Sequence, residues 1–425
     1  MRNQALKLAA ISALRARPDF SGLRQLHGCS RHESANFLTW LDQSGLALYL
    51  FARLTNCEES GVVPPYIIEA LGQRAESNSK RMEEMIREFS KVNSELRNRA
   101  IPHAFLKGFT LAPEFTPNPA LRHQTDIDIL VHPDFMAEAA EALIACGYSP
   151  RGSEAAGQLK FATPLQYVPS AHDDIYRVPA HREAELHTSI WEETGAVSLR
   201  VPNDCLERAR ACTLRDMEFF SLSSEDMFLM QAFHAFSHLL GSWVRISWLW
   251  EIEYFLRTRE GDKELWRRII ARAGDDENAR KAIGLVLFLT KELFGGSAPE
   301  AMNEWCVKTL PYRVETWARH FGIPWALSEL GGNKVTLFVH EEFVNDSSKW
   351  RGYLLRRLIP IPGRPSIGHV EASDVKTRLR GRAAEWMFAG RRLAFHASEM
   401  FRLTWEAFRW RQALQTSRKG RIASP

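Results

Sequence analysis

The chain of 425 residues contains only six cysteines, and they are scattered without any Cys-x-x-Cys spacing. This argues against a zinc site or a disulfide framework and fits a reducing cytoplasm. Long apolar runs are also missing: the longest, from Ile283 to Leu289, is bounded by Lys281 and Lys291 and is too short to cross a bilayer. Met1 to Pro18 has the pattern of a basic amphipathic helix, with no apparent signal peptide. We therefore predict a cytoplasmic protein without a transmembrane segment.

Several common nucleotide-binding and hydrolytic signatures are absent as well. The sequence has no Walker A loop, no Gly-x-Gly-x-x-Gly, no Gly-x-Ser-x-Gly and no His-Glu-x-x-His, which argues against P-loop, Rossmann and nucleophile-elbow enzymes. His234 and His238 stand four residues apart on one predicted helix face. We interpret them as partly buried helix histidines, with the lining of a nucleotide or acceptor cleft as a second possibility.

The most informative feature is a pair of aspartates that flank one apolar residue. Asp126 and Asp128 lie in the run from Thr125 to Val131, which is otherwise largely apolar. Side chains on a β-strand alternate between faces, so both carboxylates should point one way while Ile127 and Ile129 enter a core. Two ionised carboxylates this close repel each other unless a cation lies between them, and hard oxygen ligands suit Mg²⁺. The pattern predicts a metal site; the alternative is an exposed edge strand with two solvated acids.

A second pattern lies upstream of the aspartates. Pro102 to Leu106 is predicted to form a short strand that ends at Lys107 and Gly108, after which Phe109 to Glu114 can open a helix. A strand, a glycine turn and a helix N-terminus form a natural phosphate site, because backbone N–H groups point outward and the helix dipole favours an anion. Lys107 adds a positive charge. Arg122, just before the acidic strand, is expected to reach phosphates or to pair with an aspartate.

A third acidic candidate lies downstream. The run from Arg182 to Thr188 roughly alternates polar and apolar residues, which predicts a strand with Glu183, Glu185 and His187 on one face. A two-metal site needs roughly three protein carboxylates, because the ions must be bridged and their charge balanced. We predict Glu185 as the third ligand and Glu183 as its substitute. The alternative is a surface strand with a solvated polar face.

Taken in order, these motifs resemble the uncharacterised nucleotidyltransferase-like family of the DNA polymerase β-type nucleotidyltransferase superfamily. The resemblance rests on Leu106-Lys107-Gly108, Leu121-Arg122, Asp126 to Val131, Cys146-Gly147-Tyr148 and Glu185-Leu186-His187. It implies that Asp126 and Asp128 are paired metal ligands and that Glu185 is the third acid, where the family more often has Asp. It also implies that Gly108 stands in the glycine turn, although the superfamily more often has Gly-Gly or Gly-Ser there.

The resemblance implies an α+β enzyme, with a small mixed-sheet nucleotidyltransferase core flanked by N-terminal and C-terminal helical regions. Two Mg²⁺ ions would be held by the three acids, and Lys107, Gly108 and Arg122 would bind the phosphates of an NTP. NMP would pass to an acceptor hydroxyl or phosphate whose identity stays open. A different possibility is a catalytically degenerate member that binds nucleic acid, a partner protein or a membrane surface. A weaker one is another metal-dependent phosphotransferase.

The elements predict four regions along the chain. Residues 1–100 should be helical, 101–195 should form the catalytic core, 196–345 should again be helical, and 346–425 should form a Pro-rich linker and a basic amphipathic tail. Within the core we expect strands near 102–107, 126–132, 158–168 and 182–188, and one helix from Pro133 to Cys146.

Positive charge is concentrated in the C-terminal tail. The whole chain has a net charge of +4, but from residue 350 onward sixteen Lys or Arg stand against five Asp or Glu. Aromatic residues recur in this tail at helical spacing. We interpret it as a terminal helix that packs on the body and shows arginine to solvent, with nucleic-acid or membrane-surface contact as the alternatives.

Overall fold

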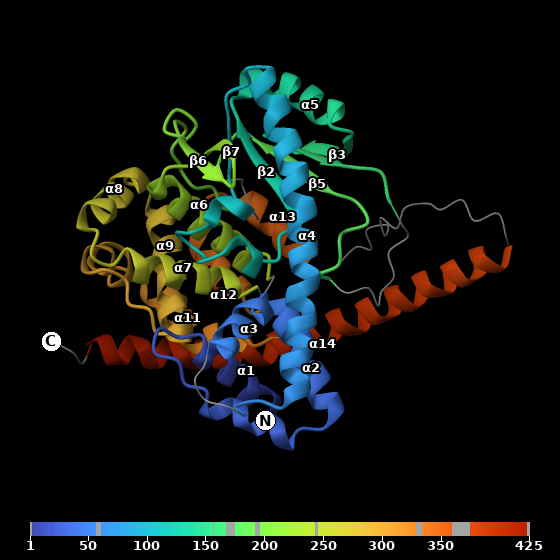
Figure 1. The fold of residues 1–425 in the computed structure, drawn as a ribbon. Coiled ribbons are helices and arrows are strands. Elements are labelled where there is room, and N and C mark those ends of the chain that lie inside the picture. Colours follow the sequence, from blue (N-terminus) through green and yellow to red (C-terminus); the bar gives the residue numbers. More distant parts are fainter. Residues whose placement is uncertain are drawn as a thin grey trace.

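The computed structural model describes residues 2–56, 61–155, 157–166, 175–191, 196–242, 245–328, 334–358 and 375–422. They form a mixed β-sheet with helices around it (Figure 1). The strands are β1 (His103–Phe105), β2 (Asp126–Val131), β3 (Ser149–Ala155), β4 (Gln158–Ala162), β5 (Glu183–His187), β6 (Arg210–Leu214) and β7 (Met217–Ser221). Their order across the sheet is β3-β4-β5-β2-β1-β7-β6. The pairs β2/β5 and β1/β7 are parallel, and the other neighbours are antiparallel.

Most of the chain is helical. Before and within the sheet lie α1 (Arg2–Ala13), η1 (Ser21–Gly28), α2 (Arg31–Ser44), α3 (Ala47–Thr55), α4 (Pro65–Asn98), η2 (Gly108–Leu111), η3 (Pro119–Leu121), η4 (Pro133–Phe135) and α5 (Met136–Ala145). After the sheet lie α6 (Ser224–Leu240), α7 (Ser247–Thr258), α8 (Lys263–Ala273), α9 (Glu277–Phe294), α10 (Glu300–Met302), η5 (Asn303–Val307), α11 (Tyr312–Ala326), α12 (Leu337–His340), η6 (Glu341–Phe343), α13 (Ser347–Leu358) and α14 (Val375–Ile422).

One face of the sheet is covered by α4 and α5. The C-terminal half of α4 is amphipathic and buries Met82, Met85, Phe89, Val92 and Leu96. These side chains share one core with alternate residues of the central strands and with the inner face of α5. Gly147 follows α5 with φ +87°, a conformation that glycine adopts freely, and so turns the chain into β3. The Pro133-to-Cys146 helix is confirmed, as η4 followed by α5.

The opposite face of the sheet meets the larger helical core. Ile127 and Ile129 lie in the core beneath α4, whereas Leu130 lies in the second core, with α1–α3 and α6–α11. Strand alternation therefore turns Asp126 and Asp128 toward the helical core; the sequence predicted that they share the face opposite to Ile127 and Ile129. The N-terminal helices and the helices after residue 224 share this second core.

Several details differ from expectation. Strand β3 was not predicted, and the strand expected near 158–168 ends at Ala162. Residues 210–221 were expected to be helical, but they form the hairpin β6–β7, with Arg215 at φ +54° in the turn. This hairpin is stabilised by a non-local pairing, Phe105 with Ser221, which local sequence does not encode. The expected helix from Phe109 to Glu114 is instead the single 3₁₀ turn η2. Helix α6 begins after Ser223, whose hydroxyl accepts a hydrogen bond from the N–H of Asp226.

Most of the basic tail is a long helix, α14, whose C-terminal part lies along the body while its N-terminal part extends away from it (Figure 1). Trp410 is buried and lies 6.0 Å from Phe321 and 5.9 Å from Phe338 between ring centroids. The Pro-rich segment 359–365 lies outside the described residues. Across the part of the chain that the structure describes, no helix is long and apolar enough to cross a membrane.

Candidate functional site

The site is assembled by strand register. In the parallel pair of β2 and β5, Asp126 lies opposite Glu183 and Asp128 opposite Glu185. Next to β5, the antiparallel strand β4 places Lys160 opposite Glu185 and Gln158 opposite His187. Three neighbouring strands therefore present their polar side chains on one face.

Three of these side chains converge closely enough to share a cation. Among the described residues, Asp128, Glu185 and His187 offer ligand atoms that all lie within 4.8 Å of one another. Two of the predicted ligands, Asp128 and Glu185, are thus brought together. Asp126 is not part of this group, and His187 is its third member. Strand alternation had placed His187 on the face of Glu185, which was the available signal for its role.

Asp128 is the buried centre of the site. Its side chain is 1% exposed, and its Oδ1 accepts a hydrogen bond from Lys107 Nζ at 3.0 Å and another from His187 Nε2 at 3.0 Å. Burial disfavours its charge, but these two neighbours outweigh burial and hold the pKa of Asp128 well below its usual range. Asp128 is therefore ionised in the folded protein.

Glu185 is held by strand β4. Its Oε2 accepts from Gln158 Nε2 at 2.7 Å, and its Oε1 accepts from Lys160 Nζ at 2.7 Å. The neighbouring acid, Glu183, is exposed, and its Oε1 lies 2.8 Å from His181 Nε2. Of the two acids predicted for the third position, the structure brings Glu185 rather than Glu183 to the aspartates.

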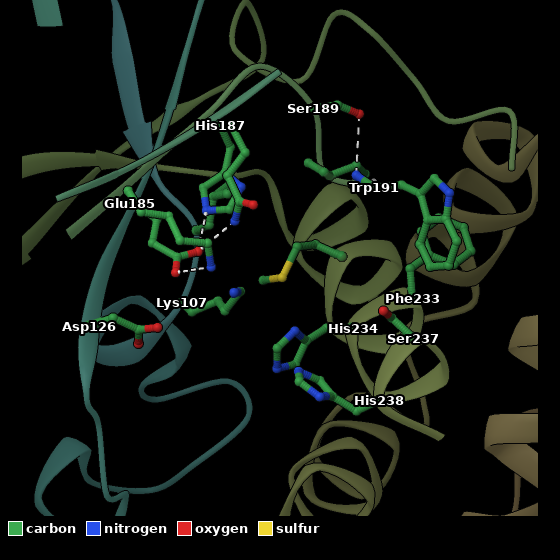
Figure 2. A pocket seen from close by; sticks show the side chains of 15 residues that line it. Lys107, Asp126, Glu185, His187, Ser189, Trp191, Phe233, His234, Ser237 and His238 are labelled. Carbon is green, nitrogen blue, oxygen red and sulfur yellow. Dashed lines mark hydrogen bonds and ion pairs between the residues drawn. The ribbon is translucent and has the colours of Figure 1, made fainter. Parts of the chain in front are cut away.

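Asp126 lines a cavity that Lys107, Glu185 and His187 also line, and it lies beside Lys107 (Figure 2). Burial, and then the negative charge of Asp128, raise the pKa of Asp126 to about 6. Burial alone would lower the pKa of Lys107, but Asp128 and Asp126 raise it instead. The Lys107 ammonium thus places a positive charge beside the carboxylates of Asp126 and Asp128.

Gly108 allows the backbone beside the site to turn tightly and to approach a neighbouring side chain closely. It is buried at φ +74°, and a Cβ there would lie 2.2 to 2.3 Å from side-chain atoms of Gln124. Gln124 in turn donates from Nε2 to the carbonyl oxygen of Asp126 at 2.8 Å. Gly108 therefore packs against Gln124, the side chain that holds the beginning of strand β2. Gly108 is not among the residues that line the cavity.

Arg122 is buried behind the site. Its Nε donates to Glu251 Oε1 on α7 at 3.0 Å, and the Glu251 side chain is 1% exposed. Glu251 also accepts from the hydroxyl of Tyr49 at 3.0 Å and from Gln231 Nε2 at 2.6 Å. Arg122 was expected to reach phosphates or to pair with an aspartate. Instead, the structure pairs it with Glu251, and it does not line the cavity.

The cavity has a volume of about 350 Å³ and lies between the sheet and α6, within the range of small-molecule sites. On its sheet side lie Lys107, Asp126, Glu185 and His187, and across from them lie His234 and His238 (Figure 2). The cleft-lining interpretation of these histidines thus matches their position.

Both histidines are packed against one tryptophan. Their ring centroids lie 4.6 Å and 4.3 Å from that of Trp248. Burial, and then the charge of Lys107, lower the pKa of His238 to about 4 and hold that of His234 well below its usual value. The α6 wall therefore offers neutral imidazoles at pH 7.

Strand-borne acids beside a lysine, in a cavity between a small mixed sheet and helices, are the kind of groups that metal-assisted phosphoryl or nucleotidyl transfer uses. A family model described as an uncharacterised nucleotidyltransferase matches residues 30–295. Because this is more than half of the chain, the protein belongs to that family. No curated protein and no solved structure matches the chain significantly. The matched region contains the whole sheet and ends with α9, before α14. Family membership supports nucleotidyl transfer as the enzyme class and an NTP as the substrate class.

Proposed function

We propose that this protein is a Mg²⁺-dependent nucleotidyltransferase that transfers NMP from an NTP to an acceptor hydroxyl or phosphate. The observation that carries the proposal is the convergence of Asp128, Glu185 and His187 within 4.8 Å, with Asp126 lining the cavity that Glu185 and His187 also line. In a member of a nucleotidyltransferase family, such a cluster is best explained as the binding site for the metal ions and the triphosphate.

The residues present fit a divalent cation. Carboxylate oxygens of Asp126, Asp128 and Glu185 are the ligands that Mg²⁺ prefers, and the His187 nitrogen is a ligand that transition metals accept readily. When bound, two Mg²⁺ ions would lower the pKa of the acceptor oxygen and neutralise charge on the leaving pyrophosphate.

The remaining chemistry falls to the chain's own side chains. The acceptor oxygen forms a bond to the α-phosphorus, and the bond from that phosphorus to the pyrophosphate oxygen breaks. Asp126, which faces the cavity, takes the proton of an acceptor hydroxyl. Lys107 neutralises charge that develops on the phosphates. His187 positions Asp128 through their 3.0 Å hydrogen bond, and Arg122, held by Glu251, positions the loop before Asp126.

The test is isothermal titration of each NTP, with and without Mg²⁺, on the wild type and on Asp126→Asn and Asp128→Asn. Glu185→Gln is compared with Glu183→Gln, a matched change at the exposed acid on the same strand. We expect Mg²⁺-dependent NTP binding that is lost in the first three variants and kept in Glu183→Gln. Equal binding by all of the variants would overturn the assignment.

One observation favours a second candidate, a catalytically degenerate binding protein. Asp128 is already paired with Lys107 and hydrogen-bonded to His187, as in a purely structural polar network. Such a protein would bind no NTP in the titration and would stay folded without metal. Mg²⁺-dependent consumption of NTP that Asp128→Asn abolishes would exclude this candidate.

A further inference from the structure

Helix α14 exposes an apolar stripe on its outer side. Leu393 is 69% exposed, Phe401 84%, Trp405 64% and Phe408 57%. Phe401, Trp405 and Phe408 follow one another at spacings of four and three residues, which places them on one face of a helix. Contiguous exposed apolar side chains of this size mark an interaction surface.

In the C-terminal part of α14, the opposite face packs on the body. Trp410 is 5% exposed and packs on α11 and on Phe338, and Leu414 packs against the same helical core. The two acids in this part of the helix, Glu399 and Glu406, are only 10% and 12% exposed. The apolar stripe is therefore held outward by packing on its other side, and no acid interrupts it.

The helix is strongly basic. Between residues 375 and 422 the sequence has twelve Lys or Arg and three Asp or Glu, which gives 12 − 3 = +9. Arg402 and Arg409 are 42% and 48% exposed and are paired with the two covered acids. Arg411 is also exposed. The outer surface thus combines exposed apolar side chains with exposed arginines, on a helix of high net positive charge.

We propose that this face of α14 binds the surface of an anionic membrane. A helix with Trp, Phe and Leu on one face and Arg at its flanks lies in the plane of the interface, with its apolar side chains among the acyl chains. The positive charge is attracted to anionic headgroups. At about 1.5 Å per residue, the 48 residues of α14 span roughly 70 Å, so the contact would be extended and parallel to the bilayer.

Two other occupants fit less well. Two copies of a +9 helix would repel each other along their length, which disfavours self-association through this face. Binding of single-stranded nucleic acid uses a cationic groove beside the stacking aromatic rings, whereas here the exposed aromatic rings lie on the convex outer face of a single helix. The membrane proposal uses different residues from the NTP site, so either proposal can fail without the other.

The test is vesicle co-sedimentation of the full-length protein. Vesicles are made of phosphatidylcholine alone, or of phosphatidylcholine and phosphatidylserine at about three to one. Phe401→Ser/Phe408→Ser removes the centre of the stripe. Ile144→Ser/Phe220→Ser is the matched control, because these side chains are 51% and 42% exposed on α5 and β7. Circular dichroism checks that both double variants are folded.

We expect binding to the anionic vesicles only, weakened by salt, and about tenfold or more weaker in Phe401→Ser/Phe408→Ser. The control should bind like the wild type. Absent binding, equal binding to neutral vesicles, or equal loss in both variants would each overturn the proposal. So would a wild type that ignores vesicles but dimerises, or binds single-stranded RNA, through the same two phenylalanines.

Discussion

The buried carboxylate of Glu251 gives the sharpest test of how the site is held. It accepts hydrogen bonds from Arg122, Tyr49 and Gln231, and it is fully buried. These partners come from the loop before β2, from α3 and from α6. Replacing Glu251 by Ala removes the common acceptor of three segments that are distant in the sequence.

The expected cost follows from burial. Arg122 is 9% exposed, so Glu251→Ala leaves a buried cation without its counter-charge, a change that typically costs about 3–5 kcal/mol. Tyr49 and Gln231 also lose an acceptor, at about 1 kcal/mol each. Water that enters the new space will recover part of this. We therefore expect the free energy of unfolding to fall by at least about 3 kcal/mol.

The assay is equilibrium unfolding in guanidinium chloride, with the loss read from the midpoint and slope. Glu264→Ala is the matched control, because this glutamate also pairs with an arginine but is 54% exposed, and surface pairs are worth about 0–1 kcal/mol. Removing both charges in Arg122→Met/Glu251→Leu should cost less than Glu251→Ala alone. A loss below about 1 kcal/mol in Glu251→Ala would refute the reasoning.

Three further predictions concern other parts of the fold. Gly108→Ala should destabilise by about 2 kcal/mol or more in thermal unfolding, since it adds a clash with Gln124 to the strain of positive φ. Gly147→Ala, with equal strain but open space, should cost less. Burial lowers the pKa of His103, so the unfolded chain binds a proton at higher pH than the folded protein does. The free energy of unfolding should therefore fall as the pH drops below ~6.5, and it should fall less in His103→Gln. Trp410→Ala should speed hydrogen exchange in α14 while leaving exchange in the sheet unchanged.

Local patterns predicted the parts of the site that lie within single segments. Alternation around Ile127 and Ile129 placed Asp126 and Asp128 on one strand face, and the same rule found the strand of Glu185. The α+β class is confirmed, as is membership of the nucleotidyltransferase family. The four region boundaries, the metal ligands and the phosphate-binding residues remain predictions.

Features that depend on distant pairings could not be predicted. The parallel register of Asp128 with Glu185 joins segments 57 residues apart, and the partner of Arg122 lies 129 residues away. The hairpin β6–β7 was missed for the same reason, because it is tied to the sheet through Phe105. Sequence periodicity reports which face a side chain occupies, but not which element will cover that face.

Helix α4 belongs to both cores of the protein. Ile67 and Leu71 near its beginning lie in the large helical core, and Met82 to Leu96 lie in the core beneath the sheet. Between them, Asn78 and Arg81 donate to carbonyl oxygens of the loop that precedes β2. Because one continuous helix contributes side chains to both cores, unfolding of either core removes packing that supports the other. We therefore expect the two cores to unfold in one cooperative step. Differential scanning calorimetry of the protein should then record a single heat-absorption peak.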